Sequence, residues 1–237
     1  MRVIGIVPAR GGSKGVPRKN IRLLNGKPLL VYTAEAALRA ARLERVILST
    51  DDEEIASVGR ICGLDVPFMR PPELATDTAP SIEVVRHALL TMAEKGEVFD
   101  AVCLLQPTNP LRRSEDIDNC INLLESSGAN SVVSVLPVPA EYNPHWVYWK
   151  NGSDRLTLAN GSSEPIPRRQ ELPRAFHRDG TVYVTRCSTV LNDKSLYGAC
   201  TAGYEMDPEF SANIDTESDW KAVERRINAE TSTNETL

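Results

Sequence analysis

The chain has 237 residues, 41% of them hydrophobic, and a formal net charge of -5. This length suits one large domain, or a domain with a modest insertion, and the apolar content is enough for a sizeable core. The acidic balance argues against nucleic-acid binding, which normally requires a basic face. No apolar window reaches the length needed to span a bilayer, so we expect neither a nucleic-acid partner nor a membrane segment.

The first element is an apolar run at residues 3–7, which predicts a buried strand, and a predicted helix follows at residues 29–41. Between them lies a segment that we call the basic loop, residues 8–22. It has no acidic residue, and its five cations are Arg10, Lys14, Arg18, Lys19 and Arg22. A cationic loop on an acidic protein indicates a local anion, and a polyphosphate is the expected ligand.

Gly11, Gly12 and Gly15 refine this prediction. Glycine adopts positive φ easily, so we expect these residues to turn their N–H groups inward and to form an anion-binding concavity. The spacing matches neither G-x-x-x-x-G-K-[ST] nor G-x-G-x-x-G. The alternative is a glycine-rich turn with solvated cations.

Strands and helices then alternate. We expect strands at residues 45–49, 65–68, 101–105 and 131–138, and helices after Asp51, over residues 81–95 and from Ser114. Asp51 is expected to cap its helix, with Glu54 completing a capping box, and Gly63 to end it. Residues 69–80 form a proline- and threonine-rich loop.

Continuous apolar strands separated by amphipathic helices predict an α/β fold with a doubly wound, mostly parallel sheet. Ligands bind such sheets at the carboxyl ends of the strands. The basic loop and the polar segments at residues 49–52 and 106–113 leave these ends. We therefore expect them to meet at one crevice.

The alternation stops at Pro139, and we expect an inserted segment over residues 139–178 within a single domain of 237 residues. Residues 151–163 are typical of hairpin turns, and the nearby aromatic residues predict a strand edge or a subunit contact. These are Trp146, Tyr148 and Trp149. The sheet resumes at residues 180–185, and a final helix over residues 217–229 precedes a polar, frayed tail from Glu230.

The five cysteines, Cys62, Cys103, Cys120, Cys187 and Cys200, contain no C-x-x-C pair. Neither a disulfide framework nor a zinc site is indicated, and the apolar runs around several of them favour buried, reduced thiols. The residues before the first predicted strand show no secretory pattern, so we expect no secretory leader. We expect a cytoplasmic protein.

Three candidate sites lie outside the basic loop, and the first two are short polar segments. Gln106 follows a buried strand and offers paired donor and acceptor contacts to a nucleobase edge or a sugar, although ordinary turn chemistry around two prolines explains it equally well. Asn213 and Asp215 are alternate residues of an extended segment, so their oxygens face one side and could hold a hard cation. The spacing alone favours Asp215 as the cap of the final helix.

A third candidate is a cluster of arginines, whose guanidinium groups suit a substrate carboxylate. Its members are Arg168, Arg169, Arg174 and Arg178. The alternative is a solvated surface loop that Glu164 and Glu171 partly neutralise. His87, His145 and His177 have no metal-ligand spacing.

Six segments resemble, in order, the acylneuraminate cytidylyltransferases, or CMP-sialic acid synthetases. They are P-A-R-G-G-S-K-G-V-P-R-K-N at Pro8, L-S-T-D-D at Leu48, R-P-P-E-L-A-T-D-T-A at Arg70, L-L-Q-P-T-N-P-L-R at Leu104, P-R-R-Q-E-L-P at Pro167 and I-D-T-E-S-D at Ile214. The resemblance implies a nucleotide-diphospho-sugar transferase fold of Rossmann-like type. It also implies CTP and Mg²⁺ as requirements, and transfer of CMP to the anomeric hydroxyl of a nonulosonic acid with release of pyrophosphate.

The resemblance also implies roles for individual residues. The implied nucleotide-binding residues are Ala9, Arg10, Gly11, Gly12, Ser13, Lys14, Lys19, Asn20, Arg70, Ser81 and Gln106. The implied sugar-binding residues are Gln106, Arg169, His177 and Arg178. Arg10, Lys19 and Asp215 would be catalytic, and Asp215 and Asn213 would hold the metal. The resemblance further implies a homodimer whose inserted segment reaches the partner's sugar pocket.

Two departures from the family pattern leave alternatives open. Asn213 replaces the first acid of a common Asp-Ile-Asp, which favours Asp215 as the metal ligand over a two-metal arrangement. His177 stands where sialate members often have arginine, so legionaminate- and pseudaminate-type sugars are options. A Kdo cytidylyltransferase is a rival that the Q-P-T-N-P-L-R and R-R-Q-E-L-P segments disfavour. A non-catalytic nucleotide-binding subunit is another, which Asn213 keeps open.

Overall fold

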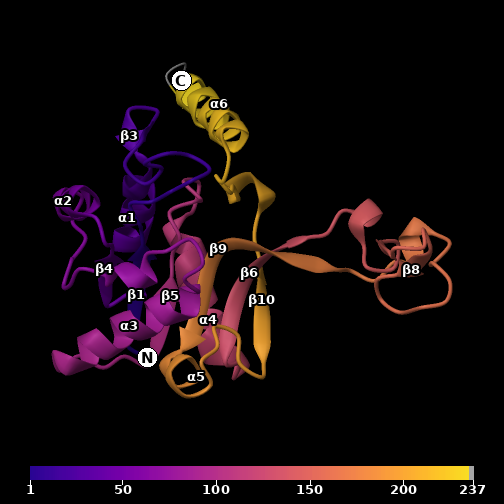
Figure 1. The fold of residues 1–237 in the computed structure, drawn as a ribbon, viewed down its shortest axis with the longest axis horizontal. Coiled ribbons are helices and arrows are strands. Elements are labelled where there is room, and N and C mark those ends of the chain that lie inside the picture. The colour runs from indigo at the N-terminus through magenta and orange to yellow at the C-terminus, as the bar shows by residue number, and fades with distance from the viewer. Residues whose placement is uncertain (235–237) are drawn as a thin grey trace. The chain divides into compact units, whose positions relative to one another are not determined.

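A computed structural model describes residues 1–234 of the chain (Figure 1). The chain forms two compact units, one made of residues 1–134 with the chain from 179 onward, the other of residues 135–178. The predicted inserted segment, 139–178, corresponds to the second unit. Of the predicted polar tail, residues 235–237 lie outside the described part, and the final helix continues to Asn234.

The first unit is built on a six-stranded sheet in the order β10-β6-β9-β5-β1-β4. Its strands are β1 Val3–Pro8, β4 Arg45–Ser49, β5 Ala101–Leu104, β6 Ser131–Pro137, β9 Phe176–Arg186 and β10 Thr201–Glu205. β1 pairs in parallel with both β4 and β5, whereas β9 pairs antiparallel with β5. The predicted α/β fold with a mostly parallel sheet is confirmed.

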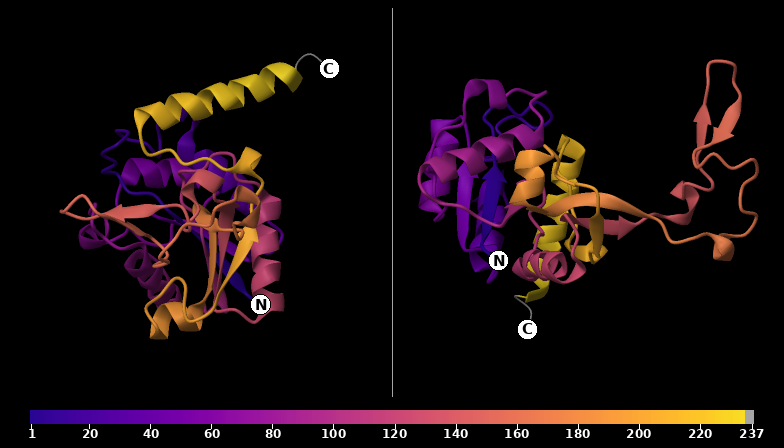
Figure 2. Two further views of the ribbon diagram at one scale, coloured as in Figure 1. Left: turned by 90° about the vertical axis from the view of Figure 1, so that its right-hand side faces the viewer. Right: turned by 90° about the horizontal axis from the view of Figure 1, so that it is seen from below.

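Helices cover both faces of this sheet (Figure 2). The helices are α1 Leu29–Arg39, α2 Glu53–Ile61, α3 Ser81–Glu94, α4 Ser114–Ser127, α5 Cys187–Asn192 and α6 Glu217–Asn234, with 3₁₀ turns η1 Pro72–Leu74, η2 Ala140–Tyr142, η3 Arg169–Glu171 and η4 Pro208–Phe210. Side chains alternate along β1, so Val3 and Val7 pack with α1 and α4, and Ile4 and Ile6 pack with α3 and α5. Burial on both faces explains the continuous apolar strand sequence.

A smaller apolar cluster joins the basic loop to the final helix. Val16 of the loop is fully buried with Ile214 and Trp220, which precede and belong to α6. The loop then closes through a short hairpin of β2 Leu23–Leu24 and β3 Lys27–Pro28. Figure 1 shows α6 and this hairpin at the same end of the unit. The core therefore anchors the loop that sequence analysis singled out.

Two local predictions are wrong. Residues 65–68 do not form a strand but make one bridge, between Ile47 and Asp65. The N-cap of α2 is Asp52, whose side chain accepts a hydrogen bond from the Ile55 N–H at 2.9 Å. Asp51 instead accepts a hydrogen bond from the Gly11 N–H, so the capping role passes to its neighbour.

The second unit contains an antiparallel hairpin of β7 Tyr148–Lys150 and β8 Leu156–Leu158, as the turn-rich sequence predicts. Buried Asn143 donates to the carbonyl of Pro173 at 2.9 Å, and Trp146 Nε1 donates to the carbonyl of Ile166 at 2.6 Å. These bonds connect the two ends of the irregular segment around the hairpin.

The cysteines are all free. Cys103, Cys120 and Cys187 are buried, as predicted, while Cys200 is exposed. Burial raises the pKa of Cys103 and of Cys187 to about 12, which makes both thiols unreactive. Across the part of the chain that the structure describes, every helix is too short or too polar to cross a membrane.

Candidate functional site

The basic loop leaves the carboxyl end of β1 and is hydrogen-bonded to the end of β4. The Ala9 N–H donates to the carbonyl of Ser49 at 3.0 Å, and the Gly11 N–H donates to Asp51 Oδ1 at 3.1 Å. The amide of Asn20, which is 6% exposed, donates to the carbonyl of Arg10 at 3.0 Å and holds the loop in its fold. The expected contact between the basic loop and residues 49–52 therefore occurs.

Two loop glycines, Gly11 and Gly15, allow close approach of neighbouring atoms, and the prediction of positive φ is wrong. Gly11, Gly12 and Gly15 all lie outside the positive-φ region, and the left-handed residue of the loop is Arg18, with φ 53°. A Cβ on Gly15 would lie 2.1 Å from the carbonyl oxygen of Asp215, whereas a Cβ on Gly12 would meet no atom within 4 Å. Gly15 is therefore required for contact with the segment before α6.

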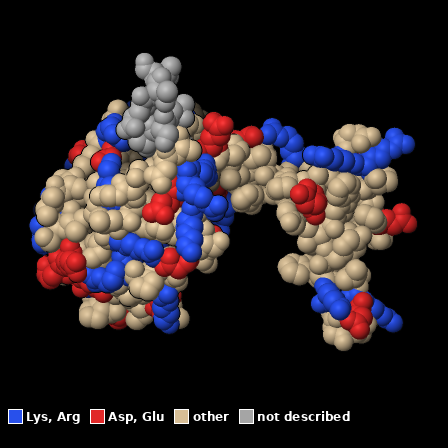
Figure 3. Space-filling model, turned by 90° about the horizontal axis from the view of Figure 1, so that it is seen from above, with Lys and Arg blue, Asp and Glu red and all other residues tan. Residues whose placement is uncertain are grey.

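All five loop cations pair with acidic side chains from elsewhere in the fold. Arg18 pairs with Asp52 and Glu54 of the α2 end, and Arg22 pairs with Glu217 and lies 4.4 Å above the Trp220 ring. Figure 3 shows Lys and Arg interleaved with Asp and Glu on one face of the larger unit. The tertiary structure therefore supplies acidic partners for the loop cations, which the sequence of the loop does not show.

The remaining three cations are those that the family resemblance assigns to a triphosphate. Arg10 Nη2 lies 2.6 Å from Asp77 Oδ1, and Lys14 pairs with the other oxygen of the same carboxylate. Lys19 Nζ donates to the carbonyl of Ile214 at 2.7 Å and lies 3.3 Å from Asp215 Oδ1. The two Lys19 contacts connect the loop to the Asn213–Asp215 segment.

Asp215 is not the cap of α6, so the interpretation favoured by spacing is wrong. Thr216 Oγ1 accepts from the Asp219 N–H at 3.2 Å, and Asp219 Oδ2 accepts from the Thr216 N–H at 2.8 Å. This reciprocal pair is a capping box, and it leaves the Asp215 side chain 61% exposed. Asn213 Nδ2 donates to Asp215 Oδ2 at 2.6 Å, so the two side chains do face the same side.

Asp215 and Asn213 fit a hard cation that takes few protein ligands. No group of three or more His, Cys, Asp or Glu side chains forms a metal cage among the residues described. Mg²⁺ often binds through one or two carboxylates and completes its shell with waters and substrate phosphates. The exposed Asp215 carboxylate beside the basic loop suits that arrangement, with Asn213 as an uncharged neighbour.

The turn after β5 is held by a buried arginine, Arg112, to which the sequence motifs assign no role. Arg112 is 4% exposed and donates to the carbonyl of Gln106 at 2.7 Å, to that of Thr181 at 2.9 Å and to Thr33 Oγ1 at 2.8 Å. Burial lowers its pKa to about 10. No local signal separates Arg112 from Arg113, which pairs with Asp116. The Ile214 N–H also donates to the carbonyl of Thr108 in this turn.

Arg70 and Ser81 flank the loop that carries Asp77. Arg70 is 5% exposed and donates through Nε to Ser49 Oγ at 3.1 Å and through Nη2 to the Ser49 carbonyl. Burial lowers the pKa of Arg70 to about 10, and nearby Asp51 opposes that shift. Ser81 begins α3, and the structure gives that helix no side-chain cap.

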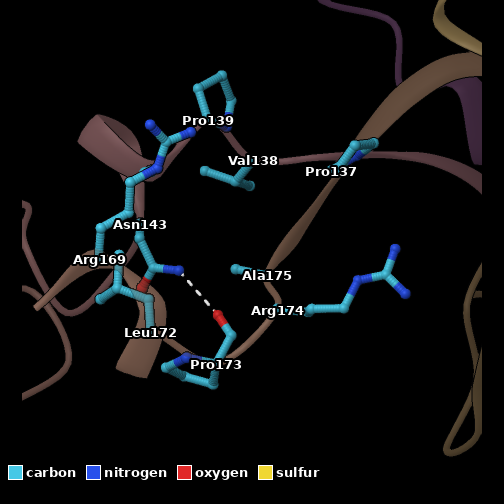
Figure 4. Close-up of a pocket in the computed structure, with 10 residues that line it drawn as sticks. Pro137, Val138, Pro139, Asn143, Arg169, Leu172, Pro173, Arg174 and Ala175 are labelled. Carbon is cyan, nitrogen blue, oxygen red and sulfur yellow. Dashed lines mark hydrogen bonds between the residues drawn. The ribbon is translucent and has the colours of Figure 1, made fainter.

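The remaining predicted sugar-binding residues belong to the second unit. Ten residues there line a cavity of about 400 Å³, including Arg169 and Arg174 (Figure 4). The Arg169 guanidinium lies beside Pro139, whereas Arg174 extends away from the other lining residues. His177 and Arg178 do not line this cavity, and His177 Nδ1 lies 3.1 Å from the Arg178 carbonyl.

Comparison with known proteins identifies the family. Residues 4–192 match the sequence profile of the family described as Cytidylyltransferase. The chain belongs to the cytidylyltransferase family. A CMP-N,N'-diacetyllegionaminic acid synthase of Legionella pneumophila is 34% identical over 226 residues, covering 95% of this chain and 96% of that cytidylyltransferase relative. The resemblance inferred from the motifs is confirmed.

An N-acylneuraminate cytidylyltransferase of Escherichia coli is 33% identical over 220 residues, covering 93% of this chain. The chain spans about half the length of that relative, 51%. A solved structure described as CMP:2-keto-3-deoxy-manno-octonic acid synthetase complexed with CTP aligns with a TM-score of 0.73 and 19% identity, covering 97% of this chain and 100% of the other. That likeness supports the same fold for this cytidylyltransferase.

Proposed function

We propose that this protein transfers CMP from CTP to the anomeric hydroxyl of a nonulosonic acid and releases pyrophosphate. The observation that carries the proposal is the contact of Lys19 with the Ile214–Asp215 segment. This contact places the cationic, glycine-containing loop beside an exposed carboxylate. The loop would bind a nucleoside triphosphate, and the carboxylate would bind its metal ion. Relatives named for CMP-sugar synthesis support the reaction class.

In the proposed reaction, the sugar hydroxyl oxygen attacks the α-phosphorus of CTP. The bond from that phosphorus to the bridging oxygen breaks, pyrophosphate leaves, and the hydroxyl proton passes to water. Arg10, Lys14 and Lys19 neutralise the phosphates, with Ser13 as a further donor. Catalysis then arises mainly from positioning and from fixed positive charge near the developing negative charge.

The metal proposal assigns Mg²⁺ to Asp215, with the Asn213 amide as an uncharged neighbour. Bound there, Mg²⁺ would screen the phosphates and lower the pKa of the attacking hydroxyl. Lys19 also contacts Asp215, so it fixes the carboxylate beside the basic loop. A single carboxylate favours one protein-bound metal ion.

For the sugar, we propose that Arg169 binds the carboxylate through its guanidinium fork. Arg169 lines the cavity of the second unit, whose volume suits a small ligand. A legionaminate-type acid is favoured, because the Legionella relative, which is named for a legionaminic acid, is 34% identical over nearly the full length of both chains. N-Acetylneuraminate, pseudaminate and Kdo are the competing acceptors.

We further propose a homodimer, in which the second unit contributes to the partner's sugar site. Its hairpin exposes large apolar side chains, with Trp149 68% exposed and Leu156 59% exposed, as an interface would require. A cytoplasmic location is part of the same proposal, because it is consistent with a CTP substrate and with five free cysteines.

The test is pyrophosphate release by the purified protein with CTP, Mg²⁺ and each of the four sugars. We expect release with at least one acid, with the highest kcat/KM for the legionaminate type. Arg10→Ala and Lys19→Ala should each lower turnover at least 100-fold while the melting temperature stays within a few degrees. Binding of CTP without pyrophosphate release in the presence of any of the four sugars would instead indicate a non-catalytic subunit.

A further inference from the structure

One carboxylate already occupies the place that the proposed triphosphate needs. Asp77 lies between η1 and α3, and its two oxygens contact Arg10 and Lys14, with 2.6 Å between Arg10 Nη2 and Asp77 Oδ1. Both cations hold the pKa of Asp77 below its usual value, Lys14 most strongly. Asp77 therefore stays ionised and acts as a counter-ion that contacts two cations of the basic loop.

Three other acids that pair with cations of this loop are fixed at the starts of helices. Asp52 is the N-cap of α2 and Glu54 lies in its first turn, while Glu217 begins α6. Asp77 belongs instead to an exposed segment between Thr76 and Thr78, and its side chain is 33% exposed. Unlike those three acids, Asp77 can leave its cations without loss of helix structure.

A polyphosphate would compete directly with this carboxylate. Phosphate oxygens would form the same charge-assisted hydrogen bonds to Arg10 and Lys14, and like charges repel when they share one site. Because a triphosphate carries several negative charges and makes further contacts, it displaces Asp77 more readily than a smaller anion does. The carboxylate therefore lowers the affinity of every anion that needs both cations, including pyrophosphate.

Building on the proposed function, we propose that Asp77 is a resident competing anion and a specificity-determining residue of the phosphate site. It occupies Arg10 and Lys14 in the ligand-free protein and gives way to CTP. It returns as the product leaves, so it weakens retention of pyrophosphate and speeds clearance of the site.

The test compares Asp77→Asn with Glu54→Gln by calorimetric titration with pyrophosphate in the absence of divalent cations. Each variant removes one negative charge near the same loop, but Glu54 pairs with Arg18. Exposed ion pairs are individually weak, so we expect Asp77→Asn to tighten pyrophosphate binding about threefold to tenfold and Glu54→Gln by less than twofold. Pyrophosphate should also inhibit Asp77→Asn turnover at correspondingly lower concentration.

The outcomes separate this proposal from the proposed function. If wild-type protein releases pyrophosphate from CTP but Asp77→Asn binds it no more tightly, Asp77 is not a competitor. Equal tightening in both variants would indicate a general charge effect and would also overturn the proposal. If neither wild type nor Asp77→Asn binds pyrophosphate or CTP, the proposed function itself fails.

Discussion

Gly12 and Gly15 are three positions apart in the basic loop and meet different surroundings. Gly15 touches the backbone of Asp215, whereas the space around a Cβ on Gly12 is open. The same residue type therefore serves two purposes at these positions: contact within the protein at Gly15 and, in the proposed function, room for a phosphate at Gly12.

We predict that Gly15→Ala displaces the segment of Asp215, since its Cβ would lie 2.1 Å from a backbone oxygen. The melting temperature should fall, with a destabilisation of about 1–3 kcal/mol, and Mg²⁺-dependent turnover should fall at least tenfold. Gly12→Ala is the matched comparison and should melt like wild type. The affinity of Gly12→Ala for CTP, measured calorimetrically, should nevertheless drop. If both variants melt at the wild-type temperature, the close contact at Gly15 is contradicted.

At the level of secondary-structure elements, the turn after β5 depends on the three hydrogen-bond donations of Arg112. These bonds join the turn to α1 through Thr33 and to β9 through Thr181. The carbonyl of Gln106 receives the third. Because a lysine cannot reproduce this fork geometry, the orientation of Gln106 should depend on the guanidinium.

Arg112→Lys is therefore expected to raise the KM for CTP or for the sugar severalfold, with a smaller effect on kcat. If Arg112 acts through Gln106, the change should have little further effect on kcat/KM in a Gln106→Ala background. A double-mutant cycle measures this coupling. Additive losses would show that Arg112 merely supports the fold.

The start of α6 yields a prediction about pH. Asp219 accepts hydrogen bonds from Thr216 Oγ1 and from the backbone N–H groups of Asp215 and Thr216, and these lower its pKa below the usual 3.8. A carboxyl with a lower pKa in the folded state adds stability that is fully present above its unfolded pKa and is lost as the pH falls through the folded one.

Asp219→Asn should accordingly cost about 1 kcal/mol near neutral pH. Its difference from wild type in urea midpoint should shrink as the pH falls below about 4. Urea denaturation at several pH values measures both midpoints. A difference that stays constant down to the acid limit would contradict the role of the ionised carboxylate.

On the scale of the whole molecule, the proposed assembly depends on the second unit. Trp149 in β7 is 68% exposed, and Ile61 at the end of α2 in the first unit is 84% exposed. We predict that Trp149→Glu converts a dimer into a monomer, because burying an unpaired carboxylate at the interface would cost more free energy than association provides. Ile61→Glu should leave the mass unchanged. Light scattering after size exclusion measures both masses, and a dimeric Trp149→Glu would exclude the hairpin from the interface.

Much of the fold is predictable because its signals are local. The apolar run of β1 and the helical spacing in α3 are readable within a few residues, and both elements form where predicted. The strand expected at residues 65–68 fails because only one bridge, from Asp65 to Ile47, joins it to the sheet. Local β-propensity does not guarantee a full ladder of partners.

The sequence by itself determined the alternation of strands and helices, the cationic loop after the first strand, and the turn that holds Gln106. Tertiary structure decided which acid faces which cation, since Asp77, Asp215 and Glu217 reach the loop from distant segments. It also decided that Thr216 and not Asp215 caps α6. The physical reason is that hydrogen bonds and ion pairs act over a few ångströms in space, and folding alone brings residues so far apart in the chain within that distance.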